Sequence, residues 1–481
     1  MPLNFKNSYK KLPEVFYKET LPEATDSPKL LLFNKELALS LDFDYLESEA
    51  LNYLSGNKTF PESTSIALAY SGHQFGHFVP LLGDGRAVLI ADFESDIGHK
   101  DLQLKGSGVT PYSRRGDGKA PLSAALREYL LSEAMYALKI PTTRALSVVK
   151  TSEKVIRQKE EAAGIIARVS NAHLRVGTFE FASANNSNNE LKELADYSIK
   201  RLYSKILKSK NLYEDFFGLI VKKQAELIVD WMSVGFIHGV MNTDNMNIAC
   251  ETIDYGPCAF MNYYNKRQVY SYIDREGRYA YSNQPKIGLW NLARLGEVLL
   301  PLFSKDEKKA INIAENILNK YFDIFNNNFV KKFSNKLGFN LIDQKFIEEF
   351  LNILESQKLD FTLSFKFLES QLKPNKLLES IFSNFSNNKM VQDFVKKWLE
   401  KIEDKDVALE LMEVNNPYLI PRNHLVDSAL VSASEEDDLS EFSKLNEYLK
   451  NPYSLQKIDL KYYLPPEEGE DHHKYFCGLL N

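Results

Sequence analysis

Cysteine is scarce in this chain, which has only Cys250, Cys258 and Cys477 among 481 residues. Three cysteines cannot cross-link a chain of this length into a disulfide framework, and their spacing matches no zinc-binding signature. Disulfides persist mainly in oxidising compartments, so we expect a reduced, intracellular protein.

Long apolar runs are also missing. No segment approaches the roughly 20 apolar residues that a membrane-spanning helix requires. Residues 1–19 mix charged and polar types and contain no apolar stretch of signal-peptide length. We therefore expect a soluble, cytoplasmic protein that does not bind a membrane.

An excess of basic residues is absent as well. The chain has 59 Lys and Arg against 65 Asp and Glu, which gives a formal net charge of −6. Proteins that coat nucleic acid usually carry a clear basic excess, so we expect no nucleic-acid partner. Local basic clusters can still bind small anions. The content of 44% hydrophobic and 26% charged residues is that of a globular protein, and the length favours two or three packed units.

The distribution of residue types divides the chain into four segments. Residues 1–66 form a mixed N-terminal extension, and residues 67–182 are rich in glycine, arginine and β-compatible runs. Residues 183–300 combine a helical stretch with irregular, motif-bearing sequence, and residues 301–481 are mostly helical. A β-rich unit followed by a larger helical unit is the order found in kinase-like phosphotransfer proteins, although this order alone fits many α+β folds.

Local patterns predict elements of the second segment. Arg86–Asp92 and Asp101–Lys105 predict short strands, and the second of them alternates polar and apolar residues. Pro121 suits the first position of a helix, and an apolar stripe at helical spacing follows it. The polar tract Ser183–Asn189 predicts a solvated loop, where we place the boundary to the third segment.

A glycine-rich stretch at residues 82–86 is the first candidate for phosphate binding. Gly83 and Gly85 flank Asp84 and permit a tight turn whose backbone N–H groups approach a phosphate. Arg86 adds a charged donor. A simple hairpin turn is the alternative, because Asp-Gly is itself a hairpin signal.

Two charged residues of opposite sign follow in a suggestive order. Lys105 ends the second predicted strand, and Glu128 lies 23 residues later on the predicted helix. In kinase-like proteins, a strand lysine held by a helix glutamate points its ammonium at the nucleotide phosphates. A chance pair of surface charges is the alternative.

Further donors cluster between and beyond this pair. Residues 113–119, which include Asp117, Gly118 and three basic side chains, suggest an anion site, with a solvated turn as the alternative. Arg168 and Arg175 lie seven residues apart, and paired arginines suit the bidentate binding of a terminal phosphate. Arginines are nevertheless common on protein surfaces.

The strongest cluster lies between His238 and Gly256. Kinases carry His-Arg-Asp, then an Asn five residues after that Asp, and later Asp-Phe-Gly. Here Val240 stands at the position of the kinase base, but Asn245 lies five residues later and Asp254 begins Asp-Tyr-Gly. The metal-binding pattern is therefore present without the usual base. Asp244, which precedes Asn245, is the nearest replacement carboxylate.

These motifs together resemble the selenoprotein O family, also called SelO or YdiU, of kinase-like protein adenylyltransferases. The resemblance runs from about residue 5 to the C-terminus and is densest between residues 67 and 300. The stretches that carry it are Tyr70–Gly76, Leu82–Arg86, Gln103–Gly108, Thr110–Gly118, Arg127–Leu130, Phe236–Asn245 and Asp254–Pro257.

The resemblance implies a protein-kinase-like, two-lobed α+β fold, with a β-rich lobe, a mostly helical lobe and extensions at both ends. It also implies that ATP binds in the reverse orientation to that in a kinase, with its γ-phosphate buried. AMP, or UMP from UTP, would be transferred to Ser, Thr or Tyr hydroxyls of other proteins, and pyrophosphate would be released.

The resemblance further implies roles for individual residues. Asp244 would be the proton acceptor, with a pKa lowered by a nearby Mg²⁺, and Glu128 would pair with Lys105. Asn245 and Asp254 would bind Mg²⁺ or Mn²⁺. The positions expected to hold the nucleotide are Gly83, Gly85, Arg86, Lys105, Asp117, Gly118, Arg168, Arg175 and Asp254.

One feature departs from the family pattern. Many members carry a C-terminal Cys or selenocysteine that is proposed to bridge to a Cys of the activation-loop region. Cys477 fits the C-terminal partner, but no Cys lies between residues 259 and 476, and the nearest candidate is Cys258, beside the metal motif. The sequence therefore does not predict redox control of the family kind.

Alternatives to the transferase remain at this stage. A conventional kinase would need the base that Val240 replaces, and an inactive pseudokinase scaffold would have no need to keep Lys105, Glu128 and the metal ligands. Two smaller patterns have plain structural interpretations. His73 and His77, among glycines, predict a turn rather than a zinc site, and Trp290 predicts a buried helix residue.

Overall fold

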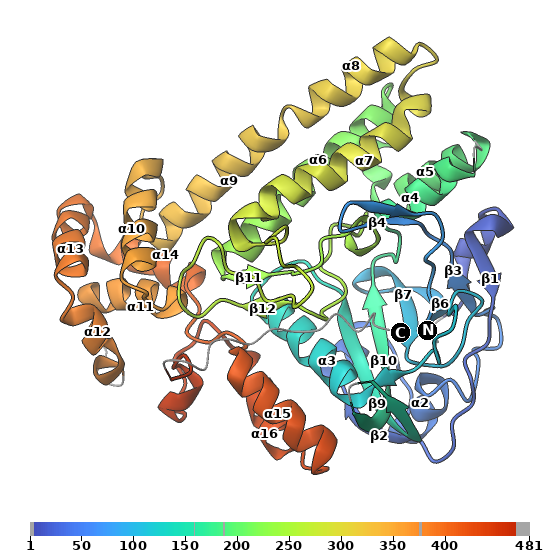
Figure 1. The fold of residues 1–481 in the computed structure, drawn as a ribbon, viewed down its shortest axis with the longest axis horizontal. Helices are drawn as coiled ribbons and strands as arrows, with labels where there is room; N and C mark the ends of the chain where they lie inside the picture. The colour runs from blue at the N-terminus through green and yellow to red at the C-terminus, as the bar shows by residue number, and fades with distance from the viewer. Residues whose placement is uncertain (1–3, 158, 186–187, 375–377, 468–481) are drawn as a thin grey trace.

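The protein is described by a computed structural model that covers residues 4–157, 159–185, 188–374 and 378–467. It is an α+β protein in which one large sheet lies at one end of the molecule and most of the helices lie at the other (Figure 1). Among the described residues, no helix combines the length and the apolar character that crossing a membrane would require.

The large sheet has eight antiparallel strands in the order β1-β3-β6-β7-β10-β9-β2, with β8 paired to β10. Its members are β1 (Tyr17–Glu19), β2 (Lys29–Phe33), β3 (Ile66–Leu68), β6 (Ala87–Ser95), β7 (Gly98–Lys105), β8 (Ala120–Pro121), β9 (Arg144–Ile156) and β10 (Glu160–Ser170). The two predicted strands are confirmed as parts of β6 and β7. Strands β1 and β2 from the first 66 residues belong to this same sheet.

Strand alternation separates the two faces of the sheet. On β7, Leu102 and Leu104 enter one hydrophobic cluster, so Gln103 and Lys105 must face the other way. On the neighbouring strand β10, Ala167 belongs to that same cluster, and Arg168 is paired in register with Gln103. The period of two therefore gathers Gln103, Lys105 and Arg168 on one face, which is the face that carries the candidate site.

Helices cover both faces of the sheet. Short helices α1 (Lys35–Ser40) and α2 (Glu47–Leu54) supply buried side chains to the first cluster. The other face packs against α3 (Leu122–Ala137), which is buried along most of its length. The predicted helix after Pro121 is thus confirmed, and Pro121 is its N-cap residue.

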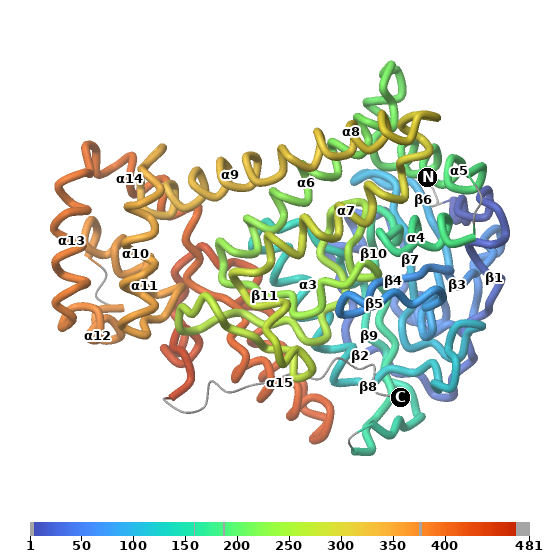
Figure 2. The backbone as a smooth tube through the Cα atoms, turned by 45° about the horizontal axis from the view of Figure 1, so that its top comes forward, coloured from blue at the N-terminus to red at the C-terminus, as the bar shows by residue number. Residues whose placement is uncertain are grey.

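The remaining helices extend away from the sheet. The helices α10 to α14 form the end of the molecule opposite the sheet (Figures 1 and 2). Helix α6 packs against α7, α8 and α9, whereas α15 returns to pack on α3. The bounds are α4 (Val176–Ala184), α5 (Asn188–Leu202), α6 (Leu212–Ser233), α7 (Gln284–Phe303), α8 (Glu307–Leu318), α9 (Tyr321–Lys336), α10 (Gln344–Ser356), α11 (Phe361–Leu372), α12 (Ser383–Ser386), α13 (Lys389–Lys401), α14 (Lys405–Asn415), α15 (Asn423–Glu435) and α16 (Ser440–Leu449).

The prediction of a loop over the polar tract Ser183–Asn189 is largely wrong. Helix α4 continues to Ala184, and α5 already begins at Asn188. The side chain of Asn185 donates to the carbonyl of Phe181 at 2.8 Å. Asparagine side chains satisfy free backbone groups at helix ends, so a polar, Asn-rich tract can terminate helices closely without forming a long loop.

Candidate active site

The motif-bearing region between residues 238 and 254, here called the catalytic segment, lies between two short paired strands. These are β11 (Phe236–Ile237) and β12 (Ala259–Phe260). The segment contains a 3₁₀ helix over Thr243–Asn245. An isolated bridge pairs Asn247 with Arg175, which directly precedes α4, and fixes the segment beside the site face of the sheet.

Four charged side chains of this region form one ionic network. Lys105 Nζ lies 2.9 Å from Glu128 Oε2 and 3.1 Å from Asp254 Oδ1. The guanidinium of Arg168 donates to both oxygens of Glu128 and, at 2.6 Å, to Asp254 Oδ1. The side chain of Glu128 is only 6% exposed. The alternative of a chance pair of surface charges at Lys105 and Glu128 is therefore wrong.

The network keeps both carboxylates ionised. Burial disfavours the charged form of Asp254, but the positive charges of Arg168, Lys105 and Arg175 outweigh it and hold its pKa well below the usual value. The same balance between burial and the charges of Arg168 and Lys105 lowers the pKa of Glu128. Asp254 also adopts a left-handed backbone conformation, with φ of +63°. A non-glycine residue in this conformation is uncommon and often belongs to a functional site.

Arg175 is buried in the same region and has a side-chain donor without a partner in the described chain. Its guanidinium sits over the ring of Tyr70, 4.4 Å from the ring centre. One of its nitrogens lies 3.7 Å from Asp84 Oδ1. Within the described chain, neither Nε of Arg175 nor Oδ1 of Asp84 has a hydrogen-bond partner. A buried guanidinium with an unpartnered donor is suited to bind a phosphate oxygen.

The glycine-rich stretch at residues 82–86 packs against residues 108–118 rather than forming a hairpin. It leads into β6, whose sheet partners are β3 and β7, so the hairpin alternative is wrong. At Gly83, with φ of +69°, a Cβ atom would lie 2.3 Å from the Tyr112 ring. At Gly118, with φ of +68°, a Cβ would lie 2.1 Å from the Gly108 backbone. Only glycine fits at these two contacts.

Side-chain hydrogen bonds hold these two stretches together. Thr110 Oγ1 donates to the Asp84 carbonyl at 2.6 Å, and Ser113 Oγ donates to the Gly85 carbonyl. Arg86 is half-buried, and no carboxylate within the described chain forms an ion pair with it. The backbone of this double loop is thus held beside the C-terminal end of β7, where Lys105 pairs with Ala87 of β6.

Asp117 is placed differently from the other expected nucleotide ligands. Its side chain is 43% exposed. Both of its oxygens accept hydrogen bonds from Arg157, at 2.8 and 2.9 Å, and this contact lowers the pKa of the carboxyl. A nucleotide contact by Asp117 would therefore have to coexist with this pair or replace it.

Asp244 is buried, and Val240 is also buried, at 1% exposure. Gln74 Nε2 donates to Asp244 Oδ2 at 3.4 Å, whereas Oδ1 has no hydrogen-bond partner within the described residues. Burial raises the pKa of the Asp244 carboxyl to about 7, although the charge of Arg175 acts in the opposite direction. The lowering expected from the sequence depends on a metal ion, whose charge would oppose the effect of burial.

The donor set fits a magnesium or manganese ion that is shared with a nucleotide. The Asn245 side-chain nitrogen donates to the Val240 carbonyl at 3.0 Å, which leaves its amide oxygen available. Asp254 contributes a carboxylate that is held ionised. No group of three or more His, Cys, Asp or Glu side chains in the described chain could hold a metal alone. One carboxylate and one amide, completed by phosphate oxygens and water, is a typical Mg²⁺ environment.

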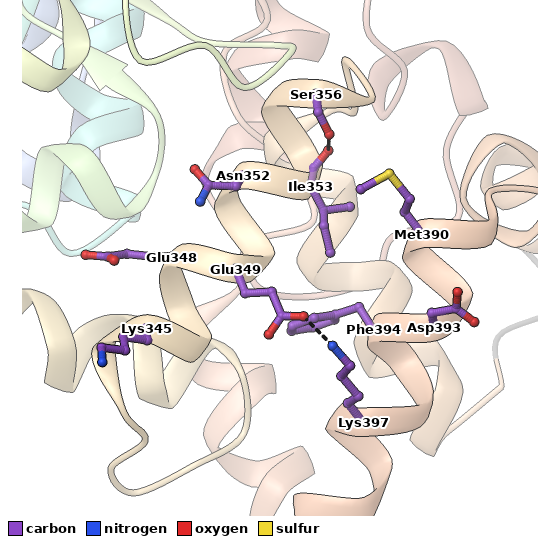
Figure 3. A pocket seen from close by; sticks show the side chains of 10 residues that line it. All are labelled: Lys345, Glu348, Glu349, Asn352, Ile353, Ser356, Met390, Asp393, Phe394 and Lys397. Carbon is purple, nitrogen blue, oxygen red and sulfur yellow. Dashed lines mark hydrogen bonds and ion pairs between the residues drawn. The ribbon is translucent and has the colours of Figure 1, made fainter.

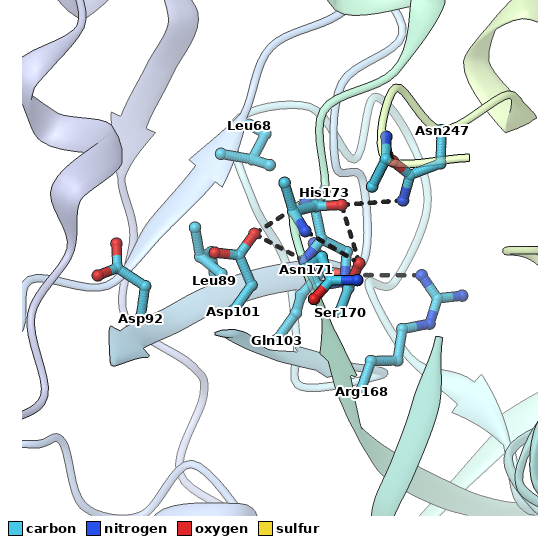
Figure 4. A network of polar contacts seen from close by, with 12 residues as sticks. Leu68, Leu89, Asp92, Asp101, Gln103, Arg168, Ser170, Asn171, His173 and Asn247 are labelled. Carbon is cyan, nitrogen blue, oxygen red and sulfur yellow. Dashed lines mark hydrogen bonds and ion pairs between the residues drawn. The ribbon is translucent and has the colours of Figure 1, made fainter. Parts of the chain in front are cut away.

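Several buried polar residues around the site could not be singled out in the sequence. Gln103 donates to Asp84 Oδ2 at 3.0 Å and accepts from Arg168, and so joins two parts of the site. Asp101, on the same strand, accepts from His173 (Figure 4). It also accepts from Arg201 of α5. The alternation of β7 gave one usable signal, because Asp101, Gln103 and Lys105 share one face.

Two smaller expectations concern the neighbourhood of the catalytic segment. His73 and His77 lie on β4 (Gly72–Gln74) and β5 (His77–Val79), which form a hairpin, so the predicted turn is confirmed. Trp290 lies on α7 as expected, but it is only half-buried, which corrects the prediction of a core residue. The guanidiniums of Arg278 and Arg294 lie 4.8 and 5.4 Å from its ring centre and cover the indole in place of apolar side chains.

The cysteines next to the site are inaccessible. Cys250 and Cys258 are buried and unpaired. Burial raises the pKa of each thiol to about 12. Cys477, the other partner in the family's redox bridge, lies outside the described residues.

A separate open pocket of about 660 Å³ lies far from these residues, between α10 and α13 (Figure 3). Ile353 and Phe394 contribute apolar surface to it, and the ion pair between Lys397 and Glu349 at 2.7 Å crosses it. None of the expected site residues lines this pocket.

Comparison with known proteins finds one matching family model and relatives that align over nearly the whole chain. A family model described as "Protein adenylyltransferase SelO" matches residues 1–450. A protein nucleotidyltransferase YdiU of Bacillus cytotoxicus is 45% identical over 486 residues, which cover 99% of this chain and 97% of the relative. The relative of the same description from Pelagibacter ubique is 44% identical over 486 residues, which cover 99% of each chain. One from Clostridium perfringens is 46% identical over 482 residues, with 99% and 97% coverage.

Proposed function

The chain belongs to the SelO family of protein adenylyltransferases, and from this premise we propose that it transfers AMP from ATP to hydroxyl groups of proteins and releases pyrophosphate. UTP would deliver UMP by the same route, because the phosphate contacts do not involve the base. The acceptors would be Ser, Thr or Tyr side chains of other proteins.

One observation carries this proposal most directly. The lysine expected to bind phosphate, its glutamate partner and two candidate metal ligands are present, while the position of the kinase base is occupied by Val240. Valine cannot accept a proton, and its side chain is buried at 1% exposure. A buried carboxylate, Asp244, instead precedes the candidate metal ligand Asn245.

The arrangement also supports a kinase-like, two-lobed organisation. In this proposal the sheet and α3 form the smaller lobe, which contributes Lys105 and Glu128. The catalytic segment and the helices from α4 onward form the larger lobe, which contributes Asn245 and Asp254. The ion pair between Lys105 Nζ and Asp254 Oδ1, at 3.1 Å, would then join the two lobes across the nucleotide site.

The proposed orientation of ATP follows from two buried arginines of the site. Arg175 has an unpartnered buried Nε, and its charge acts on Asp254, the carboxylate that also pairs with Arg168. These guanidiniums would bind the terminal phosphate, with Lys105 on the phosphates nearer the α position. The α-phosphate would then face Asp244 rather than the buried end of the site.

The transfer itself would be a displacement at the α-phosphate. The acceptor hydroxyl oxygen forms a bond to the α-phosphorus, and the bond from that phosphorus to the oxygen bridging to the β-phosphorus breaks. Asp244 takes the hydroxyl proton, and the electron pair leaves with pyrophosphate. A divalent ion held by Asn245 and Asp254 would supply neutralisation of phosphate charge. Phosphate oxygens would replace the Asp254 carboxylate as the partners of Lys105 and Arg168.

Mass spectrometry of an acceptor protein tests this function. Casein, an unfolded source of Ser, Thr and Tyr, is incubated with the full chain, ATP and Mg²⁺ or Mn²⁺. Adducts with the mass of AMP are expected. Adducts with the mass of phosphate would instead identify a kinase, and unmodified casein and unmodified enzyme would favour a scaffold.

A further inference from the structure

The β4–β5 hairpin, residues 72–79, lies directly against the catalytic segment. Three consecutive hairpin residues donate to three consecutive residues of that segment: His73 N to Thr243 Oγ1 at 2.6 Å, Gln74 Nε2 to Asp244 Oδ2 at 3.4 Å and Phe75 N to Asn242 Oδ1 at 3.0 Å. About 170 residues separate the two partners in sequence. The proposed proton acceptor, Asp244, is bonded by Gln74, the central residue of the three on the hairpin.

The hairpin turn has a conformation that fixes these donors. Gln74 pairs with His77 across the hairpin, so Phe75 and Gly76 are the two central residues of the turn. Both have positive φ values, +52° and +87°, as in the tight turns that suit the twist of a hairpin. Phenylalanine seldom adopts such a conformation. It is held there by its bond to Asn242 and by the Tyr279 ring, whose centre lies 5.1 Å away.

A buried glutamate fastens the hairpin and the catalytic segment to the same helix. Glu180 of α4 bonds His73 Nδ1 at 2.6 Å and accepts from Thr243 Oγ1 at 2.5 Å. Its side chain is 3% exposed. His73, on the hairpin, and Thr243, beside Asp244, thus share one anchor, which prevents either element from shifting independently.

The fit around the Asp244 carboxylate leaves little freedom. A Cβ atom on Gly72 would lie 2.6 Å from Asp244 Oδ1, so only glycine allows the hairpin backbone to come this close. Within the described chain, the Gln74 amide gives the Asp244 carboxylate its only hydrogen bond from the side chain of another residue. The distance of 3.4 Å is long, as catalytic contacts often are before the substrate binds.

We propose that the β4–β5 hairpin positions Asp244 for the transfer reaction, and that Gln74 is a positioning residue that holds its carboxylate toward the acceptor hydroxyl. This inference rests on the proposed function, in which Asp244 accepts the proton. Gln74 acts only through Asp244 and does not bind the nucleotide. Misplacing a catalytic group by about 1 Å can lower the rate by roughly 100-fold.

Replacement of Gln74 by methionine tests the role of the amide, because methionine keeps the length and removes the donor. The transfer of labelled AMP from α-labelled ATP to casein is measured with the full chain and saturating Mn²⁺. We expect Gln74→Met to lower kcat by about 10- to 100-fold and to change KM for ATP by less than about twofold. Gln344→Met makes the same exchange at an exposed position on α10 and should match the unaltered chain.

A double-mutant cycle separates positioning from a merely structural role. If Gln74 acts through Asp244, adding Gln74→Met to Asp244→Asn should cause no further loss of kcat. The proposal would be overturned if the double variant lost kcat by the product of the two single losses. An unchanged kcat in Gln74→Met would overturn it as well. If Gln74→Met proves unstable in thermal unfolding, Gln74→Glu takes its place in the cycle. An unaltered chain that transfers no AMP at all would contradict the proposed function itself, a result distinct from those of the cycle.

Discussion

Asp254 accepts a hydrogen bond from Arg168 at 2.6 Å, and this contact joins the catalytic segment to the fifth strand along the sheet. Lys105 approaches the same oxygen, at 3.1 Å. The carboxylate that is expected to bind the metal ion is therefore paired with two cations that are expected to bind phosphate. Nucleotide and metal would enter this site by exchanging partners with the charges of an existing network.

Replacing Asp254 should abolish transfer while the fold persists. Asp254→Ala removes a metal ligand, but Glu128 remains as a partner for both Lys105 and Arg168. We expect almost no AMP transfer, with a thermal unfolding midpoint close to that of the unaltered chain. Asp393→Ala, at an exposed position on α13, provides the control. A normal transfer rate in Asp254→Ala would remove this residue from the metal site.

Arg175 should distinguish ATP from AMP. The hydrogen bond of a charged donor contributes roughly 1.5–3 kcal/mol, so Arg175→Gln should weaken ATP binding by about 10- to 100-fold. AMP lacks the terminal phosphate and should lose much less affinity. Arg168 gives a less direct test, because its removal would leave Glu128 buried with one partner fewer.

Calorimetry in an Asp244→Asn background makes this comparison without consuming ATP. Arg275→Gln, at an exposed position, is the matched exchange. If Arg175→Gln lost equal affinity for ATP and for AMP, the terminal phosphate of ATP would not bind at Arg175.

Asp244→Asn should be nearly inactive with unchanged nucleotide affinity. The amide keeps the shape of the carboxylate but cannot accept the proton, and general-base catalysis contributes typically 10²–10⁴-fold. Turnover should fall by about that factor, whereas ATP affinity measured by calorimetry should change little. Near-normal turnover in Asp244→Asn would mean that another group or water takes the proton.

The close contact between the two ends of the stretch at residues 108–118 makes Gly118 the most sensitive of the expected glycines. Gly118→Ala would place a methyl group 2.1 Å from the Gly108 backbone. We expect a lower unfolding midpoint and weaker ATP binding. Gly98→Ala has a similar positive φ of +92° but open space around it, so it separates backbone strain from the clash. Equal effects of the two substitutions on ATP binding would show that the loop contact is unimportant.

The buried cysteines should resist thiol reagents. A pKa of about 12 leaves almost no thiolate at pH 8, and both side chains are inaccessible. In a Cys477→Ser chain, iodoacetamide should therefore modify Cys250 and Cys258 only after denaturation. Rapid modification of Cys258 in the native chain would reopen the possibility of a redox bridge at that position.

The parts of the site that follow regular patterns could be predicted from the sequence. The alternation of Asp101–Lys105 places Gln103 and Lys105 on one face of β7, and the stripe after Pro121 predicts the helix that carries Glu128. The replacement of the kinase base by Val240 was visible from spacing alone, because the motif order is preserved.

Other features depend on contacts that no local pattern encodes. The hairpin at residues 72–79 meets the catalytic segment through single hydrogen bonds, two of them from backbone N–H groups, between residues about 170 positions apart. The pairing of Asp117 with Arg157 joins a loop to the end of a strand that was not predicted. Trp290 is half-buried against the guanidiniums of Arg278 and Arg294, a surrounding that the apolar character of tryptophan does not predict.

The position of the transferred phosphorus is tested most directly by two labels. The full chain is incubated with casein, Mg²⁺ or Mn²⁺, and ATP labelled at either the α- or the γ-phosphate. We expect casein to become labelled only from α-labelled ATP, with one pyrophosphate released per AMP transferred. Label transferred from the γ-phosphate would contradict the adenylyltransferase assignment and identify the chain as a kinase.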